Sequence, residues 1–219
     1  MIGGQVYGGQ LGFIRRYQGR ANEVVERQEQ AVSAHPGNVA WRAGLAASLC
    51  WLDRRAEASS ILDEASWDGF DYVAPVPTML ATLALYADAA AQVRHGKAAK
   101  KLYERMEPCS EQVVWMTVQG YGHVRLWLGL LADVLGAHEQ ADEHLGFACE
   151  FHEANDVPLW AARGHLGRAE ALATRGDPAR AREHATHAFE LSREHGYGAF
   201  VERAAVLIAP KSTAEADGR

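Results

Sequence analysis

One stretch of the chain, residues 121–148, constrains the fold more than any other. Its first half carries apolar side chains at helical spacing in two adjacent stripes, so a helix there must be covered on two sides. Gly136 stands where a helix end favours glycine. Ala141, Leu145 and Ala148 then mark one face of a second helix. The stretch predicts a helical hairpin with too much apolar surface to be stable alone.

The spacing of this hairpin recurs along the chain. At five places a turn residue stands five positions before a small residue, and successive small residues are about 34 to 42 positions apart. A period of this length is typical of helical solenoids, in which each helix pair buries the face of its neighbour. The turn residues are Gly19, Asp53, Arg94, Gly136 and Gly176, and the small residues are Val24, Ala58, Ala99, Ala141 and Ala181.

The units resemble tetratricopeptide (TPR) repeats, whose first helix carries a Leu-Gly pair and whose second helix is rich in alanine. Leu11-Gly12 and Leu128-Gly129 match the pair, and Pro36 closes the first unit. A small residue is needed in the pair because the two helices pack closely there. The resemblance implies an all-α fold, a right-handed α-solenoid of about five TPR-like helix hairpins with a short C-terminal capping helix.

The pattern predicts one helical-repeat domain over residues 1–209, with the capping helix at residues 199–209. Residues 210–219 carry no apolar stripe and are expected to form a disordered tail. Three glycines between residues 5 and 18 weaken the first helix, because glycine disfavours a helix interior. We therefore expect the exposed N-terminal repeat edge to be covered by a partner, by a second copy in a homo-oligomer, or by further repeats of a longer array.

Some segments depart from the repeat pattern. Arg168-Ala169 replaces the Leu-Gly pair in the fifth unit. Gly120 and Gly122 fall at the start of the long central helix and are expected to bend it. Residues 67–77, with two prolines, form the longest irregular link, which is expected to fold over the edge of a repeat.

Composition narrows the class of protein. Of the 219 residues 48% are hydrophobic and 23% are charged, which is ordinary for a folded chain. The net charge of −6 argues against direct nucleic-acid binding, which needs clustered Lys and Arg. The longest apolar run, residues 79–93, is too short for a bilayer, so no membrane contact is expected. Three cysteines without CxxC spacing and no evident signal peptide predict a reducing, cytoplasmic location.

Several segments are similar to the C-terminal helical-repeat region of large actinobacterial-type signalling ATPases. This group includes LuxR-type regulators, relatives of the maltose-regulon activator and ATPases linked to a cyclase domain. The similar runs include LGFIRRYQGR, LWLGLLADVLG and AEALATRGDPARAREHATHAFELSREHG. The resemblance implies the regulatory part of a bacterial signalling or transcription-regulatory system, with an ATPase or cyclase sister domain among its partners.

No motif in the sequence assigns a reaction. The chain has neither a GxxxxGK[ST] phosphate loop nor a GxSxG nucleophile elbow, so we expect a non-catalytic protein without a cofactor. His184 and His187 lie three positions apart, and His138 and His144 flank another short run. Neither pair has an identifiable third ligand, which a metal site requires, so no metal is predicted.

The remaining candidate site is the concave face, which the first helix of each unit lines in TPR arrays. We expect it to hold a protein or peptide segment; the alternative is a small-molecule effector in a groove that closes around it. Each residue taken alone is more often inter-repeat packing or solvent-exposed surface. The projected concave-face residues are Phe13, Arg16, Tyr17, Trp51, Asp88, Gln92, His123, Asp133, Arg163 and Glu170. Truncating Trp51 or Arg163 is then expected to weaken binding without unfolding the chain.

Overall fold

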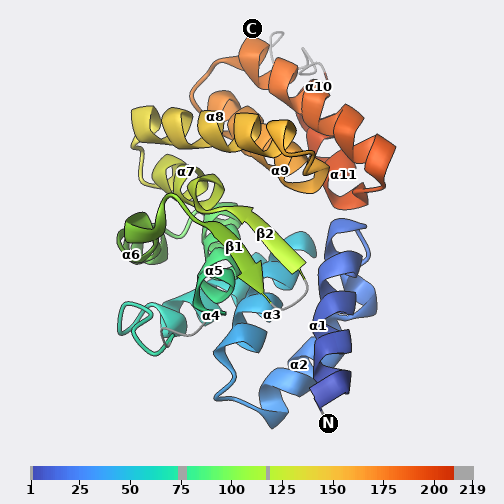
Figure 1. Cartoon of the computed structure of the whole chain (residues 1–219), viewed down its shortest axis with the longest axis vertical. Helices are drawn as coiled ribbons and strands as arrows, with labels where there is room; N and C mark the ends of the chain where they lie inside the picture. Colours follow the sequence, from blue (N-terminus) through green and yellow to red (C-terminus); the bar gives the residue numbers. More distant parts are fainter. Residues whose placement is uncertain (1, 74–77, 117–118, 210–219) are drawn as a thin grey trace, which may run out of the picture.

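The computed structural model describes residues 2–73, 78–116 and 119–209 and is mostly helical (Figure 1). The expected disordered tail, residues 210–219, lies outside the described residues. The helices are α1 (Ile2–Tyr17), α2 (Val25–Ala34), α3 (Val39–Trp51), α4 (Arg55–Ala65), α5 (Met79–Val93), α6 (Gly96–Met106), α7 (Val124–Val134), α8 (His138–Ala154), α9 (Pro158–Thr174), α10 (Pro178–His195) and α11 (Gly198–Ile208).

The helices pack as sequential pairs, with α3 on α4, α5 on α6, α7 on α8 and α9 on α10. The odd-numbered helices also pack on one another in chain order from α1 to α11. Because α11 returns to contact α1, the first and last helices of this series meet (Figure 1). The predicted all-α class is confirmed for the described residues, and the helix expected near the C-terminus is α11.

The turns within the helix pairs have the backbone conformation that the sequence pattern requires. All five predicted turn residues have positive φ, between 54° and 82°. Left-handed backbone ends a helix without a Cβ clash when the residue is glycine, and costs more at Asp53 and Arg94. The five small residues that follow these turns are all buried.

Gly129 lies in close contact with α8. A Cβ built on Gly129 would lie 2.6 Å from Leu145 Cγ and 3.0 Å from the Leu145 backbone nitrogen. The second of these atoms belongs to a helix backbone and cannot rotate away. This is the physical reason for the glycine in the Leu-Gly pair of this unit.

The start of the central stretch was expected to be a bent helix, and this prediction is wrong. Two strands, β1 (Val113–Met116) and β2 (Gln119–His123), form an antiparallel sheet, and α7 begins only at Val124. Gly122 has φ of +76°, which a right-handed helix does not allow. Val113 to Trp115 are β-branched or aromatic and favour a strand. The apolar stripes begin at Val124, where α7 also begins, so only the extension of the helix back over Gly120 and Gly122 was wrong.

The irregular link after α4 folds against α6, as expected, over the part that is described. Lys101 Nζ donates to the carbonyl of Ser66 (2.9 Å), and Arg105 Nη2 donates to the carbonyl of Val73 (2.7 Å). Phe70 is buried at the centre of the link. Residues 74–77 lie outside the described residues.

Within the described ranges, no helix combines the length and the apolar character needed to cross a membrane.

Candidate functional site

Eight of the ten predicted concave-face residues come together where α1, α3, α5 and α9 face one another, with α11 beside them. They form one connected set of ionic and aromatic contacts, called here the central network. Its members among the predicted residues are Phe13, Arg16, Tyr17, Trp51, Asp88, Gln92, Arg163 and Glu170.

Asp88 of α5 is the ionic centre of the network. Its Oδ1 accepts from Arg163 Nε (3.2 Å) and Nη2 (3.0 Å), and both side chains are 1% exposed. Its Oδ2 accepts from Gln92 Nε2 (3.0 Å) and more weakly from Trp51 Nε1 (3.4 Å). A buried carboxylate that is paired and hydrogen-bonded on both oxygens avoids the large cost of an isolated buried charge.

Arg203 of α11 extends the ionic network. Its Nη1 donates to Gln92 Oε1 (2.8 Å), its Nη2 pairs with Glu170, and its guanidinium lies over the Trp51 ring, 4.6 Å from the centroid. Sequence reasoning missed Arg203 because α11 was assigned only a capping role. The available signal was Phe200 and Arg203 at i and i+3, which places both on one face of the helix.

Aromatic rings form the other half of the network. Tyr17 packs edge-on against Trp160 (5.5 Å between centroids) and lies against Phe200 (5.4 Å) and Trp51 (6.5 Å). Burial is the main reason that the pKa of Tyr17 is raised far above its usual value, so the phenol stays neutral. Phe13 makes an edge contact with Tyr121 of β2 at 5.4 Å.

This packing covers part of the face that the sequence predicts as an open groove. Tyr121 of β2 and Phe200 of α11 both contact rings of the predicted concave face. Arg16, Tyr17, Asp88 and Arg163 are buried, while Phe13, Trp51, Gln92 and Glu170 are only partly exposed. Side chains of β2 and α11 thus pack on rings of the face that the sequence predicts as concave.

Two predicted residues lie outside the network. His123 is the N-cap of α7, where its Nδ1 accepts from the Arg125 backbone, and its ring contacts Phe147 and Phe151 at 4.9 and 4.7 Å. Asp133 lies in the last turn of the same helix and pairs with Arg94 at 2.9 Å. Neither residue takes part in the contacts that connect the central network.

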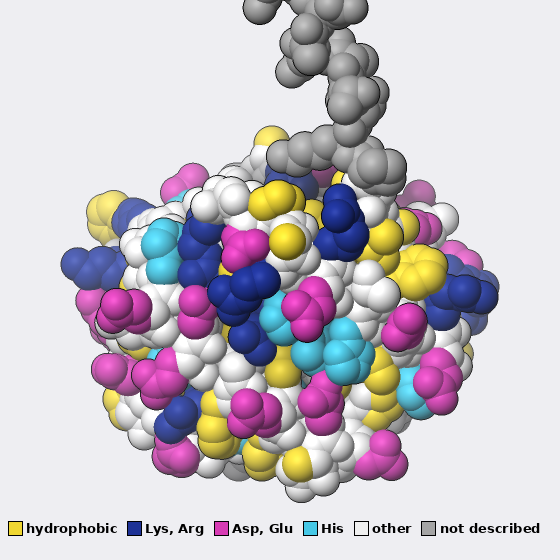
Figure 2. Space-filling model, turned by 90° about the horizontal axis from the view of Figure 1, so that it is seen from above, with side chains coloured by type: hydrophobic (Ala, Val, Ile, Leu, Met, Phe, Trp, Pro, Cys, Tyr) yellow, Lys and Arg dark blue, Asp and Glu magenta, His cyan; other side chains and the backbone are white. Residues whose placement is uncertain are grey.

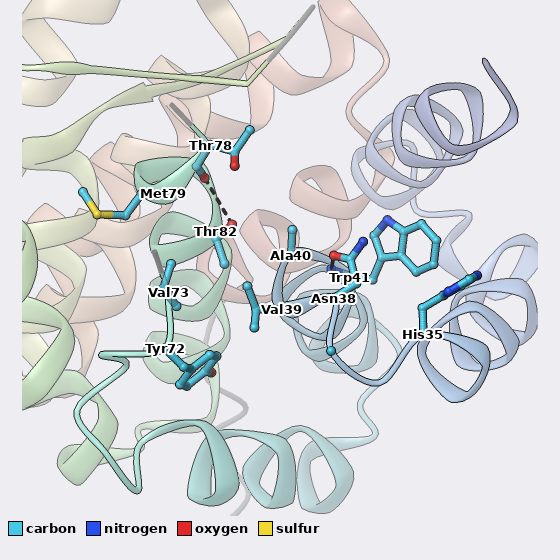
Figure 3. Close-up of a pocket in the computed structure, with 11 residues that line it drawn as sticks. His35, Asn38, Val39, Ala40, Trp41, Tyr72, Val73, Thr78, Met79 and Thr82 are labelled. Atoms are coloured by element: carbon cyan, nitrogen blue, oxygen red, sulfur yellow. Dashed lines mark hydrogen bonds between the residues drawn. The ribbon is translucent and has the colours of Figure 1, made fainter. Parts of the chain in front are cut away.

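A separate hollow of about 620 Å³ lies between the start of α3 and the start of α5 (Figure 3). Trp41 stands on one side of it, next to His35, and Tyr72, Met79 and Thr82 stand on the other. The Thr82 hydroxyl donates to the Thr78 carbonyl (3.1 Å), so this polar group is already satisfied. The lining of the hollow is mixed, with both polar and apolar side chains, and no sequence pattern indicated it.

The central network contains paired charges and ring faces, which side chains of the same chain already occupy. Asp88 is paired with Arg163, and Glu170 with Arg203. Such an arrangement is suited to shape and charge complementarity, of the kind that Trp, Tyr and Arg provide at protein interfaces.

No protein-family model matches this chain, and no curated protein or solved structure shows significant similarity to it. The resemblances to TPR repeats and to signalling ATPases therefore stay predictions from the sequence.

Proposed function

We propose that this chain is a non-catalytic helical-repeat module that binds an amphipathic helix of a protein partner. Its place would be the regulatory or scaffold part of a bacterial signalling or transcription system, beside an ATPase or cyclase domain. The observation that supports this is the contact of four predicted concave-face residues, Tyr17, Trp51, Gln92 and Glu170, with one side of α11, at Phe200 and Arg203.

The same proposal includes a right-handed α-solenoid of about five TPR-like hairpins. The five left-handed turns and the five buried small residues that follow them support a repeating unit. In such an array the odd-numbered helices line the inner face, and this is where the network lies.

In this proposal α11 acts as an internal substitute for the partner helix. The partner would present an aromatic residue and a basic residue one turn apart, as α11 presents Phe200 and Arg203. An intramolecular competitor acts at an effective concentration on the order of millimolar. Partner binding to the intact chain is then weak until α11 is displaced.

A charge reversal on α11 tests this proposal. Arg203→Glu places a carboxylate beside Glu170 and removes the cation from the Trp51 ring, so it should release α11 from the network. A fluorescent peptide of residues 196–209 with the natural sequence should then bind the variant chain at least tenfold more tightly than the wild-type chain, measured by anisotropy.

Glu202→Lys is the matched control, because Glu202 is exposed on the same helix. This variant should bind the peptide as weakly as the wild-type chain does. Adding Trp51→Ala to Arg203→Glu should remove the gain. Equal, weak binding by the Arg203→Glu and Glu202→Lys chains, with helicity retained in both, would contradict the proposal.

A small-molecule effector sensor is the second candidate, and one observation favours it. Arg16 Nη1 is buried and has no hydrogen-bond partner among the described residues. Such a guanidinium nitrogen would suit a small carboxylate or phosphate. A thermal-shift screen of nucleotides, sugar phosphates and short organic acids tests this candidate, because a ligand of the native state raises Tm. A shift lost in Arg16→Gln, together with no peptide binding by Arg203→Glu, would favour the sensor.

A further inference from the structure

Three helices bring a carboxylate and two imidazoles together at the end of the molecule formed by α8, α9 and α10. Glu153 of α8, His165 of α9 and His187 of α10 each offer one ligand atom, and these atoms all lie within 4.8 Å of one another. Figure 2, which views this end from above, shows several histidine side chains gathered beside acidic ones on the surface. The sequence paired His187 with His184 but could not supply ligands from other helices.

The contacts in this cluster are direct. His165 Nε2 lies 2.7 Å from Glu153 Oε1, and His187 Nε2 lies 3.5 Å from the same oxygen. The rings of His165 and His187 are stacked, with centroids 4.1 Å apart. Ligand atoms around a tetrahedral zinc ion lie roughly 3.3 Å apart, given bonds of about 2.0–2.2 Å. Because imidazole lone pairs lie in the plane of the ring, the His187 ring must rotate out of its stack on His165 before both rings can point at one ion, and its half-exposed position leaves room for that rotation.

The environment of the three side chains suits metal binding. His165 is 6% exposed and held by packing, whereas Glu153 and His187 are 41% and 48% exposed and can adjust. One side of the cluster is therefore open to solvent, which leaves room for a fourth ligand such as water. Two imidazoles and one carboxylate are a common protein ligand set for zinc.

His184 contacts His165, the buried imidazole of the three, at the ring nitrogen that does not face Glu153. Its Nδ1 lies 3.0 Å from Nδ1 of His165, so one of these nitrogens donates to the other. If a cation took the place of the proton on His165 Nε2, the remaining ring proton would sit on Nδ1 and be donated to His184. Such a second hydrogen bond fixes the tautomer and orientation of metal-bound histidines.

Charged groups around the cluster have opposite effects on the binding of a cation. Burial is the main reason that the pKa values of His165 and His184 are lowered, the latter to about 4, which keeps both rings neutral near pH 7. The positive charge of Arg168 contributes to both shifts and would oppose a bound cation. The carboxylate of Glu153, at hydrogen-bond distance from His165, would offset it.

We propose that Glu153, His165 and His187 form a binding site for a divalent transition-metal ion of the zinc class, with His184 as a positioning residue. The ion would connect α8, α9 and α10 and so join two neighbouring helix pairs. Its binding should stabilise this end of the chain against unfolding, because the three ligands come together only in the folded state.

Zinc titration of the untagged full chain, freed of metal with a chelator, tests the site. Isothermal titration calorimetry with zinc chloride should give one saturable site per chain, and zinc should raise Tm. His187→Ala and Glu153→Gln should each lower the affinity at least tenfold and abolish the rise in Tm. Both residues are half-exposed, so the variants should fold.

His138→Ala is the matched control, because His138 is an exposed histidine at the start of α8. It should bind zinc like the wild-type chain. His184→Gln should keep a stoichiometry of one with an affinity lowered by about 10- to 100-fold, as expected for a positioning residue. Absence of saturable zinc binding, or equal affinity in the His187→Ala and His138→Ala chains, would overturn the proposal.

Discussion

Asp88 and Arg163 lie 75 residues apart in the chain and form an ion pair of 3.0 Å in which both side chains are 1% exposed. The pair joins α5 to α9 across the interior. Its position explains why residues that the sequence placed on a binding face contribute to the stability of the fold.

Removing one partner of this pair should destabilise the chain strongly. Asp88→Ala leaves a buried guanidinium uncompensated, and we expect the free energy of unfolding to fall by about 3–5 kcal/mol in urea denaturation. Asp71→Ala is the control, because Asp71 is 80% exposed in its pair with Arg105 and should cost at most about 1 kcal/mol. Similar losses in the two variants would contradict the assigned burial.

The same geometry changes the expectation for Arg163→Ala. The sequence alone predicted weaker binding without unfolding, but a fully buried arginine paired with Asp88 belongs to the folded core. We now expect Arg163→Ala to lower Tm as well as any binding. Circular dichroism melting of this variant beside Trp51→Ala, whose side chain is only partly buried, distinguishes the two roles.

Alanine at two glycines of the central helix pair should have opposite effects. At Gly129 a Cβ would lie 3.0 Å from the Leu145 backbone nitrogen, so Gly129→Ala should cost about 1–3 kcal/mol through overpacking. At Gly146 no atom lies within 4 Å of the added Cβ, so Gly146→Ala should stabilise by up to about 1 kcal/mol through helix propensity. Urea denaturation gives both values, and a neutral Gly129→Ala would show that the two helices are not in close contact.

Contact between α1 and α11 should depend on Gly198. A Cβ there would lie 2.5 Å from the carbonyl oxygen of Gln18, so Gly198→Ala should separate the two helices. Hydrogen exchange should then rise in α1 and α11 while α7 to α9 stay protected. Gly96→Ala, also at the first residue of a helix but with open space around it, is the control and should leave exchange in α1 unchanged.

Acid should destabilise the chain through His152. This imidazole is fully buried, and its Nε2 accepts from the His123 backbone nitrogen at 2.9 Å. Burial first, and His123 second, lower its pKa from 6.5 to about 4. The unfolded chain therefore binds a proton between these pH values while the folded chain does not. The free energy of unfolding should fall as pH decreases from about 6.5 towards 4, by up to about 1.4 kcal/mol per pH unit, with no contribution above that window.

Urea denaturation at several pH values between 7.5 and 5 checks the direction of this pH dependence. His152→Gln keeps an acceptor for the His123 N–H but cannot be protonated. The slope of its free energy of unfolding against pH should therefore be smaller than that of the wild-type chain. His184 shifts in the same direction, so the slope should not vanish. Exposed His138→Gln should keep the wild-type slope, and an unchanged slope in His152→Gln would contradict the prediction.

Local patterns in the sequence determined the helical hairpins, because their causes are short-range. Apolar side chains at helical spacing define a helix, left-handed turn residues such as Gly136 and Gly176 end it, and a glycine such as Gly129 marks a close helix contact. The β-hairpin was missed because the helical spacing of apolar residues was extended across Gly122, whose positive φ excludes a helix.

Only the tertiary structure decided what the inner face contains. The sequence placed Asp88 and Arg163 on one face of the array, but their pairing depends on how far successive helix pairs turn. That rotation is the sum of small packing angles and cannot be read from residue spacing. The same accumulated rotation brings Phe200 of α11 against Tyr17 of α1. His165 instead meets His187 of its own helix pair and Glu153 of the preceding helix, so the proposed metal site depends on packing between consecutive helices, which residue spacing within one helix does not show.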